Sequence, residues 1–110
     1  MTRKILIDIV SDVICPWCFL GKRRLDKALA LLPDVAAEIS WRPFMLDPTI
    51  PLEGMDRRSY LVNKFGEERL QTLHDPLIAA GREDGVPYNF EKITRTPNTL
   101  NAHRLLRWSH

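Results

Sequence analysis

Hydrophobic positions along the first part of the chain indicate two strands with a helix between them. Ile5–Val10 is a short, almost continuous apolar run rich in β-branched residues, typical of a strand buried on both faces of a parallel sheet. From Phe19 to Leu32 the apolar residues follow helical spacing, and basic residues take the other face. Glu38–Leu46 predicts a second strand, in which Pro43 indicates an edge position or a bulge. This order predicts a β-α-β unit with a right-handed crossover.

Helical spacing dominates the second half of the chain. After the turn-rich loop Asp47–Gly54, Asp56 is suited to cap a helix, and Gly66 marks an expected break in that helix. Gly81–Phe90 is a further turn-rich break. We therefore expect helices rather than strands in this part of the chain.

A last helix is predicted over Asn98–His110, with Thr96 as its cap and Pro97 at its first position. This helix has no glycine cap and no stop proline, so we expect the chain to end within it. A two-stranded sheet is also only marginally stable on its own. Both features predict that the polypeptide is the front part of a longer protein.

Size, composition and charge exclude several classes of protein. The 110 residues suffice for a modest core, and the net charge of +2 is too small to indicate a nucleic-acid partner. No apolar stretch approaches the roughly 18 residues of a membrane span, and the run after Lys4 is too short for a signal-peptide core. With two cysteines in the chain, we expect a reducing cytoplasm, where disulfides are transient and catalytic.

Both cysteines lie in the sequence Cys15-Pro16-Trp17-Cys18, the strongest chemical signal in the chain. A C-x-x-C pair beside a β-α-β pattern is typical of a thioredoxin-like redox site. The unpaired N–H groups and positive dipole of a helix start stabilise a thiolate, so we expect a mildly lowered pKa for Cys15. One helical turn brings Cys18 close enough to close a disulfide. We therefore expect Cys15 to attack a substrate disulfide and Cys18 to resolve the mixed intermediate.

The neighbours of the two cysteines have expected roles of their own. Pro16 suits the first helical turn, which does not need its N–H, and Trp17 and Phe19 are expected to be exposed beside the site. Asp12 is interpreted as a solvated or capping carboxylate, with a proton relay as the alternative. The aromatic residues expected in the core are Trp41, Phe44 and Phe65.

A zinc site is the alternative use of the two cysteines. The candidates for its other ligands are His74, His103 and His110. Their spacing fits no H-x₃₋₅-H pair, and Pro16-Trp17 is unusual between zinc ligands. No metal is therefore expected.

Three separated segments resemble one family. Ile9–Lys22, with the Cys-Pro-Trp-Cys motif, resembles the active-site segment of the DsbA-like thioredoxin family, in particular of its FrnE-type thiol-disulfide oxidoreductases. Trp41–Pro48 is similar to the second-strand segment of that branch. Thr96–Leu105 resembles its helix-insert motif, which also occurs in the glutathione-using 2-hydroxychromene-2-carboxylate isomerases. The segments stand in the family's order and span nearly the whole chain.

The resemblance implies an α/β fold with two parts. A thioredoxin-like β-α-β half is expected over residues 1–52, and the first part of an α-helical insertion domain over residues 53–110. The resemblance also implies that Asn98, Thr99 and His103 contact substrate or glutathione beneath the cysteines, with a structural role for His103 as the alternative. The family's cis-proline loop is not found, and Pro87, which imitates its local pattern, is interpreted as a turn proline.

Three functions stay open at this point. A dithiol oxidoreductase or isomerase, acting on protein or small-molecule disulfides, is favoured by the presence of both cysteines. A glutathione-dependent isomerase would use glutathione as co-substrate, but that branch typically has serine in place of Cys15. A non-catalytic thioredoxin-like binding module is the third. No cofactor beyond the Cys15–Cys18 pair is expected, and an open sheet edge favours pairing with a second copy as a homodimer.

Overall fold

The structure, a computed structural model, describes residues 3–109. The chain divides into two compact units, Met1–Leu46 and Asp47–His110, and each is described by itself. The division into residues 1–52 and 53–110 that the resemblance implies stays a prediction.

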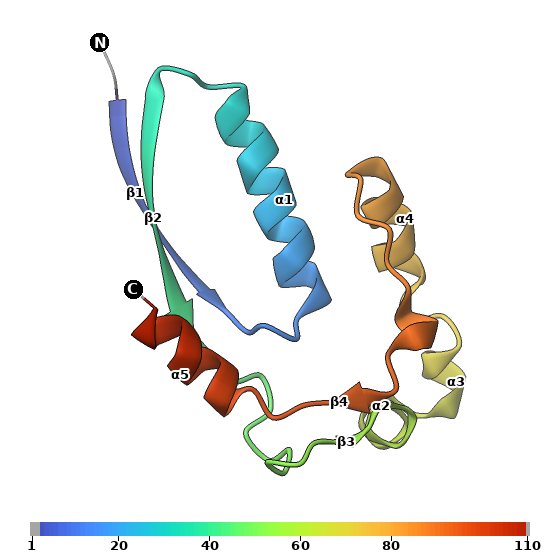
Figure 1. The fold of residues 1–110 in the computed structure, drawn as a ribbon. Coiled ribbons are helices and arrows are strands. Elements are labelled where there is room, and N and C mark those ends of the chain that lie inside the picture. The colour runs from blue at the N-terminus through green and yellow to red at the C-terminus, as the bar shows by residue number, and fades with distance from the viewer. Residues whose placement is uncertain (1–2, 110) are drawn as a thin grey trace. The chain divides into compact units, whose positions relative to one another are not determined.

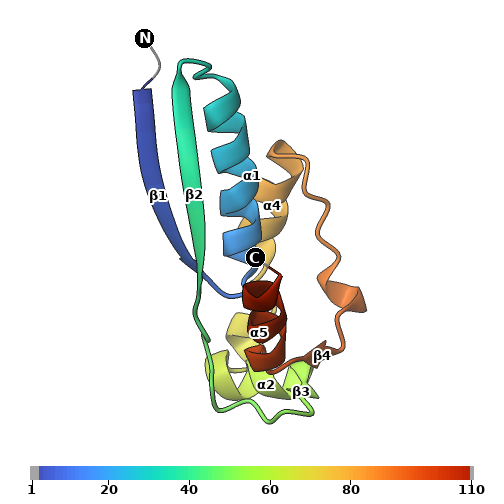
Figure 2. The same ribbon diagram turned by 60° about the vertical axis from the view of Figure 1, so that its left-hand side comes forward.

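The first unit is a β-α-β arrangement. Strand β1 (Arg3–Ser11) leads to helix α1 (Pro16–Ala30), which is followed by strand β2 (Val35–Pro43). The two strands pair in parallel, from Arg3 opposite Val35 to Ser11 opposite Pro43, and α1 runs along one side of the pair (Figure 1 and Figure 2). The predicted α/β fold and the parallel pairing are confirmed.

The end of β2 differs from the prediction. Pro43 is the last residue of the strand rather than an interior one, because proline has no N–H to donate to a ladder. The next residue, Phe44, donates its N–H to the carbonyl of Ser11 over 3.1 Å. The ends of β1 and β2 are therefore held together beside the segment that carries the cysteines.

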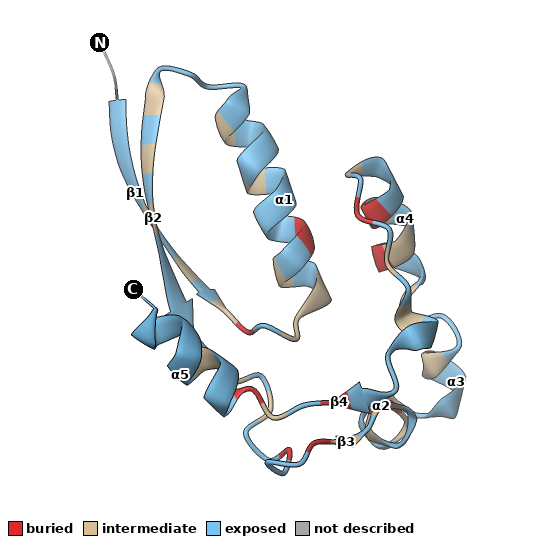
Figure 3. Ribbon diagram, in the orientation of Figure 1, coloured by how far each residue is buried: buried red, intermediate tan, exposed pale blue. Residues whose placement is uncertain are grey.

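The prediction that Ile5–Val10 is buried on both faces is wrong. Leu6 is 75% exposed and Val10 is 59% exposed, and most of β1 has the colour of exposed residues in Figure 3. Trp41 and Phe44, which were expected in the core, are 41% and 51% exposed. In the described part of the chain β1 has one neighbouring strand and one helix beside it, and these cannot cover two faces.

Short helices make up most of the second unit. In chain order its elements are β3 (Met55–Asp56), α2 (Arg57–Phe65), α3 (Glu67–Leu70), α4 (Asp75–Glu83), the 3-10 helix η1 (Phe90–Lys92), β4 (Arg95–Thr96) and α5 (Leu100–Trp108). The apolar side chains buried in this unit are Ile50, Leu61, Leu77 and Val86. The predicted helical character after residue 54 is confirmed, except that the two-residue strands β3 and β4 were not expected.

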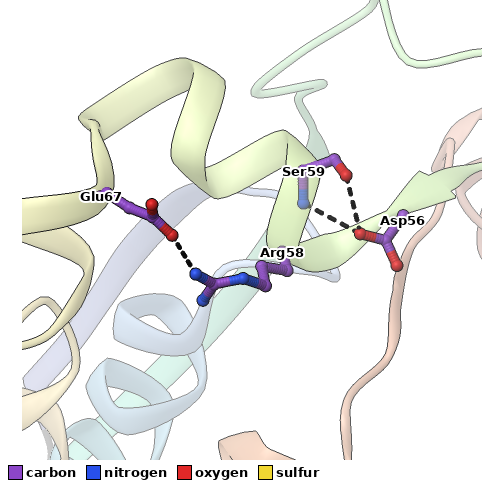
Figure 4. A network of polar contacts seen from close by, with 4 residues as sticks. All are labelled: Asp56, Arg58, Ser59 and Glu67. Carbon is purple, nitrogen blue, oxygen red and sulfur yellow. Dashed lines mark hydrogen bonds and ion pairs between the residues drawn. The ribbon is translucent and has the colours of Figure 1, made fainter.

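The predicted cap of the first helix in this unit at Asp56 and its break at Gly66 are confirmed. The carboxylate of Asp56 accepts the N–H of Ser59 over 2.9 Å at the start of α2 (Figure 4). An ion pair between Arg58 and Glu67 joins α2 to α3 in the same view. Gly66 ends α2 with a φ of +88°, which glycine adopts without a steric penalty. Phe65, expected in the core, is half-buried.

The predicted start of the last helix is wrong. Thr96 lies in β4, opposite Met55 in an antiparallel pair, and Pro97 lies outside the helix. Helix α5 begins at Leu100, whose N–H is accepted by the side chain of Asn98 over 2.9 Å. The local capping pattern was outweighed by a strand pairing with a distant segment. Helix α5 ends at Trp108, with Ser109 as its C-cap, and His110, the last residue of the predicted helix, lies outside the described residues.

The turn-rich break begins later than predicted. Gly81 lies inside α4 and is buried, and the helix continues to Glu83. A Cβ atom at Gly81 would lie 2.5 Å from the carbonyl oxygen of Val86, so only glycine lets the following segment return this closely. Across residues 3–109, no helix is long and apolar enough to cross a membrane.

Candidate active site

The two cysteines lie where β1 is followed by α1. Cys15 is the N-cap of α1, with a φ of −84° and a ψ of 111°, and its sulfur accepts the N–H of Cys18 over 3.4 Å. Its carbonyl oxygen also accepts N–H groups, from Cys18 over 3.1 Å and from Phe19 over 3.2 Å. Both cysteines are free thiols, are partly exposed, and lie within hydrogen-bonding reach of each other. The predicted position of the pair at a helix start is confirmed.

The residues around the pair follow from the start of the helix. Pro16 takes the first helical position, where its missing N–H costs nothing. Trp17 and Phe19 point away from the interior and are about half exposed, as predicted. Leu20, one position further on, is buried and fixes the helix to its unit. The helix therefore presents an apolar surface next to the thiols.

The predicted lowering of the Cys15 pKa is wrong. Burial raises the pKa of the Cys15 thiol, and the hydrogen bond with the Cys18 side chain raises it as well. The N–H groups of Cys18 and Trp17 act in the opposite direction and are too weak to reverse the shift. The start of the helix therefore does not decide the pKa of Cys15, because burial and the second thiol outweigh it.

Cys18 is the thiol whose pKa is lowered. Burial acts to raise it, but hydrogen bonds from the Ser11 hydroxyl, the Cys15 side chain and the Asp12 main chain together outweigh the burial. The negative charge of Asp12 acts in the opposite direction and raises the pKa of Cys18. The two thiols titrate as a pair, and in this reduced arrangement the thiolate is favoured on Cys18.

Asp12 is the buried charge of this region, at 3% exposed. Its Oδ2 accepts the main-chain N–H of Leu46 over 2.8 Å, and its carbonyl accepts the N–H of Cys15 over 3.2 Å. The expectation of a solvated carboxylate is therefore wrong, because the side chain is turned inward to a backbone donor. The carboxylate does satisfy a backbone N–H, but that N–H lies just past β2 rather than in the loop that Asp12 was expected to cap.

Ser11 was not predicted from the sequence to belong to the site. Its hydroxyl hydrogen-bonds to Cys18 and lowers the pKa of that thiol. The signal available was a polar residue at the end of an apolar strand, directly before the cysteine segment. The backbone N–H of Leu46 was also missed, and no pattern in the sequence indicates it.

The other predicted contact residues lie together in the second unit. Asn98 donates to the carbonyl of Ile50 over 2.7 Å and accepts from Leu100, so both ends of its amide bind the backbone. Thr99 is 3% exposed, and its carbonyl accepts the N–H of His103 over 3.0 Å. These contacts hold the start of α5. Contact of Asn98, Thr99 or His103 with substrate or glutathione stays a prediction.

The zinc site that was the alternative use of the two cysteines requires further ligands close to them. Within residues 3–109, no three or more histidine, cysteine, aspartate or glutamate side chains gather closely enough to hold a metal ion. His110, one of the candidate zinc ligands, lies outside the described residues.

Residues 6–110 match the model of the DSBA-like thioredoxin domain. The chain belongs to this family. A crystal structure of a probable DsbA oxidoreductase from Streptomyces coelicolor is similar to the DSBA-like domain described here, with a TM-score of 0.78 and 34% sequence identity over 93% of the chain. The uncharacterized protein YwbO of Bacillus subtilis (strain 168) is 31% identical over 94 residues, or 84% of the chain.

The DSBA-like chain is shorter than both of these relatives. It spans 42% of the length of YwbO and 45% of the Streptomyces coelicolor chain. The matched part has the thioredoxin fold of the family.

Proposed function

We propose that the chain carries the redox centre of a thiol-disulfide oxidoreductase of the FrnE-type branch, acting on protein or small-molecule disulfides. The observation that supports this most directly is the paired geometry of the two thiols. Cys15 caps α1, Cys18 lies one helical turn further on, and the N–H of Cys18 donates to the sulfur of Cys15. Two free thiols held this closely can exchange with a disulfide and then close on each other.

The reaction has two exchange steps. In the first, a thiolate of the pair attacks one sulfur of the substrate disulfide, a mixed disulfide forms, and the other half of the substrate leaves as a thiolate. In the second, the remaining cysteine attacks the protein sulfur of the mixed disulfide. The Cys15–Cys18 disulfide forms and the second half of the substrate leaves. The substrate disulfide is reduced by two electrons, the pair is oxidised, and the two thiolates released take up the protons of the dithiol.

Cys15 is assigned the first attack and Cys18 the second. The lowered pKa of Cys18 favours a thiolate in the reduced pair, and the hydrogen bond between the two side chains gives its proton a route between the sulfurs. Attack from Cys15 leaves Cys18, inside the first helical turn, to close the ring. In a reducing cytoplasm, where we place this reaction, the pair is held as the dithiol that attacks disulfides.

Insulin reduction in the presence of dithiothreitol tests the proposal. The unmodified chain is expected to accelerate precipitation of the insulin B chain, and both Cys15→Ser and Cys18→Ser are expected to abolish the acceleration. No acceleration by the unmodified chain would sink the proposal for this polypeptide.

Trapping of a mixed disulfide tests the two roles. Without a resolving thiol, Cys18→Ser should accumulate an adduct with a disulfide substrate that non-reducing electrophoresis detects, whereas Cys15→Ser should accumulate little. The opposite distribution would give the first attack to Cys18.

A further inference from the structure

Asp12 is placed between the two cysteines and the end of the second strand. Its main-chain N–H donates to the sulfur of Cys18, and its carbonyl accepts the N–H of Cys15. Its side chain reaches in another direction and accepts the N–H of Leu46 over 2.8 Å. One residue thus holds both halves of the dithiol and a segment 34 positions away along the chain.

The burial of this carboxylate requires an explanation. Asp12 is 3% exposed, and a buried charge is costly unless hydrogen bonds compensate for the lost water. A hydrogen bond from a main-chain N–H to a carboxylate is charge-assisted and stronger than a neutral one. The exposed pair of Asp8 and Arg42 on the same two strands, with 3.6 Å between its charged atoms, is held far less tightly.

We infer that Asp12 is a positioning residue for the dithiol: its carboxylate fastens the loop before Cys15 to the backbone beyond β2, while its main chain binds both cysteines. The two residues between Asp12 and Cys15 add little packing of their own, since Val13 is exposed and Ile14 is only half-buried. The inference rests on the proposed function for its biological meaning. The chemistry of the two thiols tests it separately.

The second exchange step is the one that depends on this anchor. The first step needs only an accessible thiolate. Closure of the Cys15–Cys18 disulfide needs the two sulfurs aligned, and small misplacements of reacting groups slow an intramolecular reaction strongly. A loosened loop should therefore slow closure more than it slows the first attack.

A stoichiometric aromatic disulfide whose released thiolate is coloured separates the two steps. The reduced chain releases one coloured thiolate when the mixed disulfide forms and a second when the ring closes. Each rate is followed across pH. At high pH the attacking cysteine is fully deprotonated, so the plateau of each rate reports how well the reacting sulfurs are aligned. The pH at the midpoint reports the charge of the neighbouring groups.

Three variants separate the contribution of the hydrogen-bond acceptor at Asp12 from that of its charge. Asp12→Ala removes the charge and the acceptor, and its closure plateau should fall by about tenfold. Asp12→Asn keeps an amide oxygen facing Leu46, and its plateau should stay within about twofold of the unmodified chain. Asp8→Ala removes an exposed carboxylate from the same unit and should change neither step.

The outcomes separate the inference from its alternatives. Equal plateaus in all three variants would overturn the inference, and an equal fall in Asp12→Ala and Asp12→Asn would also overturn it, because the charge rather than the anchor would then matter. Failure of insulin reduction with intact closure kinetics would contradict the proposed function alone.

A measurement on the unmodified chain covers the case in which Asp12→Ala does not fold. The amide hydrogen of Leu46 should exchange with solvent slowly, at a rate comparable to amides within the β1–β2 ladder, and should stay protected in Asp12→Asn. An amide of Leu46 that exchanges as fast as those of exposed loops would overturn the anchor.

Discussion

The main-chain nitrogen of Cys18 lies 3.4 Å from the sulfur of Cys15 and donates a hydrogen bond to it. This contact closes the first turn of α1 on its own N-cap and brings the second thiol to the first. The two thiols also influence each other's ionisation, because the Cys18 side chain raises the pKa of Cys15 and the Cys15 side chain lowers that of Cys18. The order in which the thiols ionise is therefore decided by the groups that face each sulfur.

The first prediction concerns that order. In the reduced chain, Cys18 should be alkylated with a midpoint at lower pH than Cys15. The pKa of Cys18 is lowered by hydrogen bonds from Ser11 and Asp12, whereas burial and Cys18 raise that of Cys15. Iodoacetamide labelling over a pH series, resolved by peptide mass spectrometry, measures both midpoints.

Cys18→Ser is the control for this order. Removal of the neighbouring thiol takes away two contributions that raise the pKa of Cys15, so its alkylation midpoint should move to lower pH. A midpoint for Cys15 below that of Cys18 in the unmodified chain would contradict the prediction.

Two glycines in helices give the second prediction. Gly81→Ala should lower the free energy of unfolding by about 1–3 kcal/mol, because the new methyl group would meet the carbonyl of Val86 at 2.5 Å and the ring of Tyr88 at 2.8 Å. Gly21→Ala is the matched change in α1, where nothing lies within 4 Å, and should stabilise the chain by up to about 1 kcal/mol. Urea denaturation followed by circular dichroism measures both, and a stabilised Gly81→Ala variant would refute the close approach.

The position of the cysteines could be predicted because its signals are local. Pro16 at a first helical position and the helical spacing from Leu20 onward together place Cys15 at the cap. The parallel pairing of β1 and β2 followed from a helix lying between two strands, which rarely permits another arrangement.

The order of the thiol pKa values could not be predicted in the same way. It depends on the Ser11 hydroxyl and the Asp12 N–H meeting the sulfur of Cys18, which no spacing in the sequence indicates. The anchor between Asp12 and Leu46 likewise joins segments that only the fold brings together.

Burial was predicted least well. An apolar pattern shows which side chains gain from being covered, but coverage depends on which elements lie nearby. Trp41 and Phe44 are therefore exposed in the described chain although their residue types favour a core. The pairing of Met55–Asp56 with Arg95–Thr96 is two residues long, which is too short to leave a periodic signal in the sequence. It places Thr96 in a strand, where the sequence predicted the start of a helix.

The third prediction concerns the cap of α2. Asp56→Ala should lower the free energy of unfolding at neutral pH, because the carboxylate accepts both the N–H and the hydroxyl of Ser59 (Figure 4). Hydrogen bonds from Ser59 hold the pKa of Asp56 below its ordinary value of 3.8. The contribution is therefore full above that value and is lost as the pH falls through the lower pKa of the folded state.

Denaturation at two pH values checks this cap. The difference between the unmodified chain and Asp56→Ala should be clear at about pH 7 and should be smaller at about pH 3, below the ordinary pKa of 3.8, where the unfolded chain already binds the proton. Asp56→Asn, which keeps an acceptor, should lose less stability than Asp56→Ala. A difference that is the same at both pH values would assign the effect to something other than the ionised cap.

The fourth prediction is a pH dependence centred on His74. Its ring stacks on Phe90 with 4.0 Å between centroids and an interplanar angle of 10°, and its Nε2 lies 3.2 Å from the guanidinium of Arg57. Because arginine can only donate, the imidazole must accept at Nε2 and is neutral in this arrangement. Burial lowers the pKa of His74, the charge of Arg57 lowers it further, and Asp75 partly opposes both.

The sign follows from the depressed pKa. The unfolded chain takes up a proton at the ordinary value of 6.5, whereas the folded chain takes it up at lower pH. The free energy of unfolding should therefore be constant above that value and fall as the pH drops below it. His74→Phe keeps a ring for stacking on Phe90 and cannot titrate, so its stability should change less between about pH 8 and about pH 5. Urea denaturation of both chains at the two pH values measures the difference, and parallel losses in the two chains would show that the site formed by His74, Arg57 and Phe90 does not sense pH.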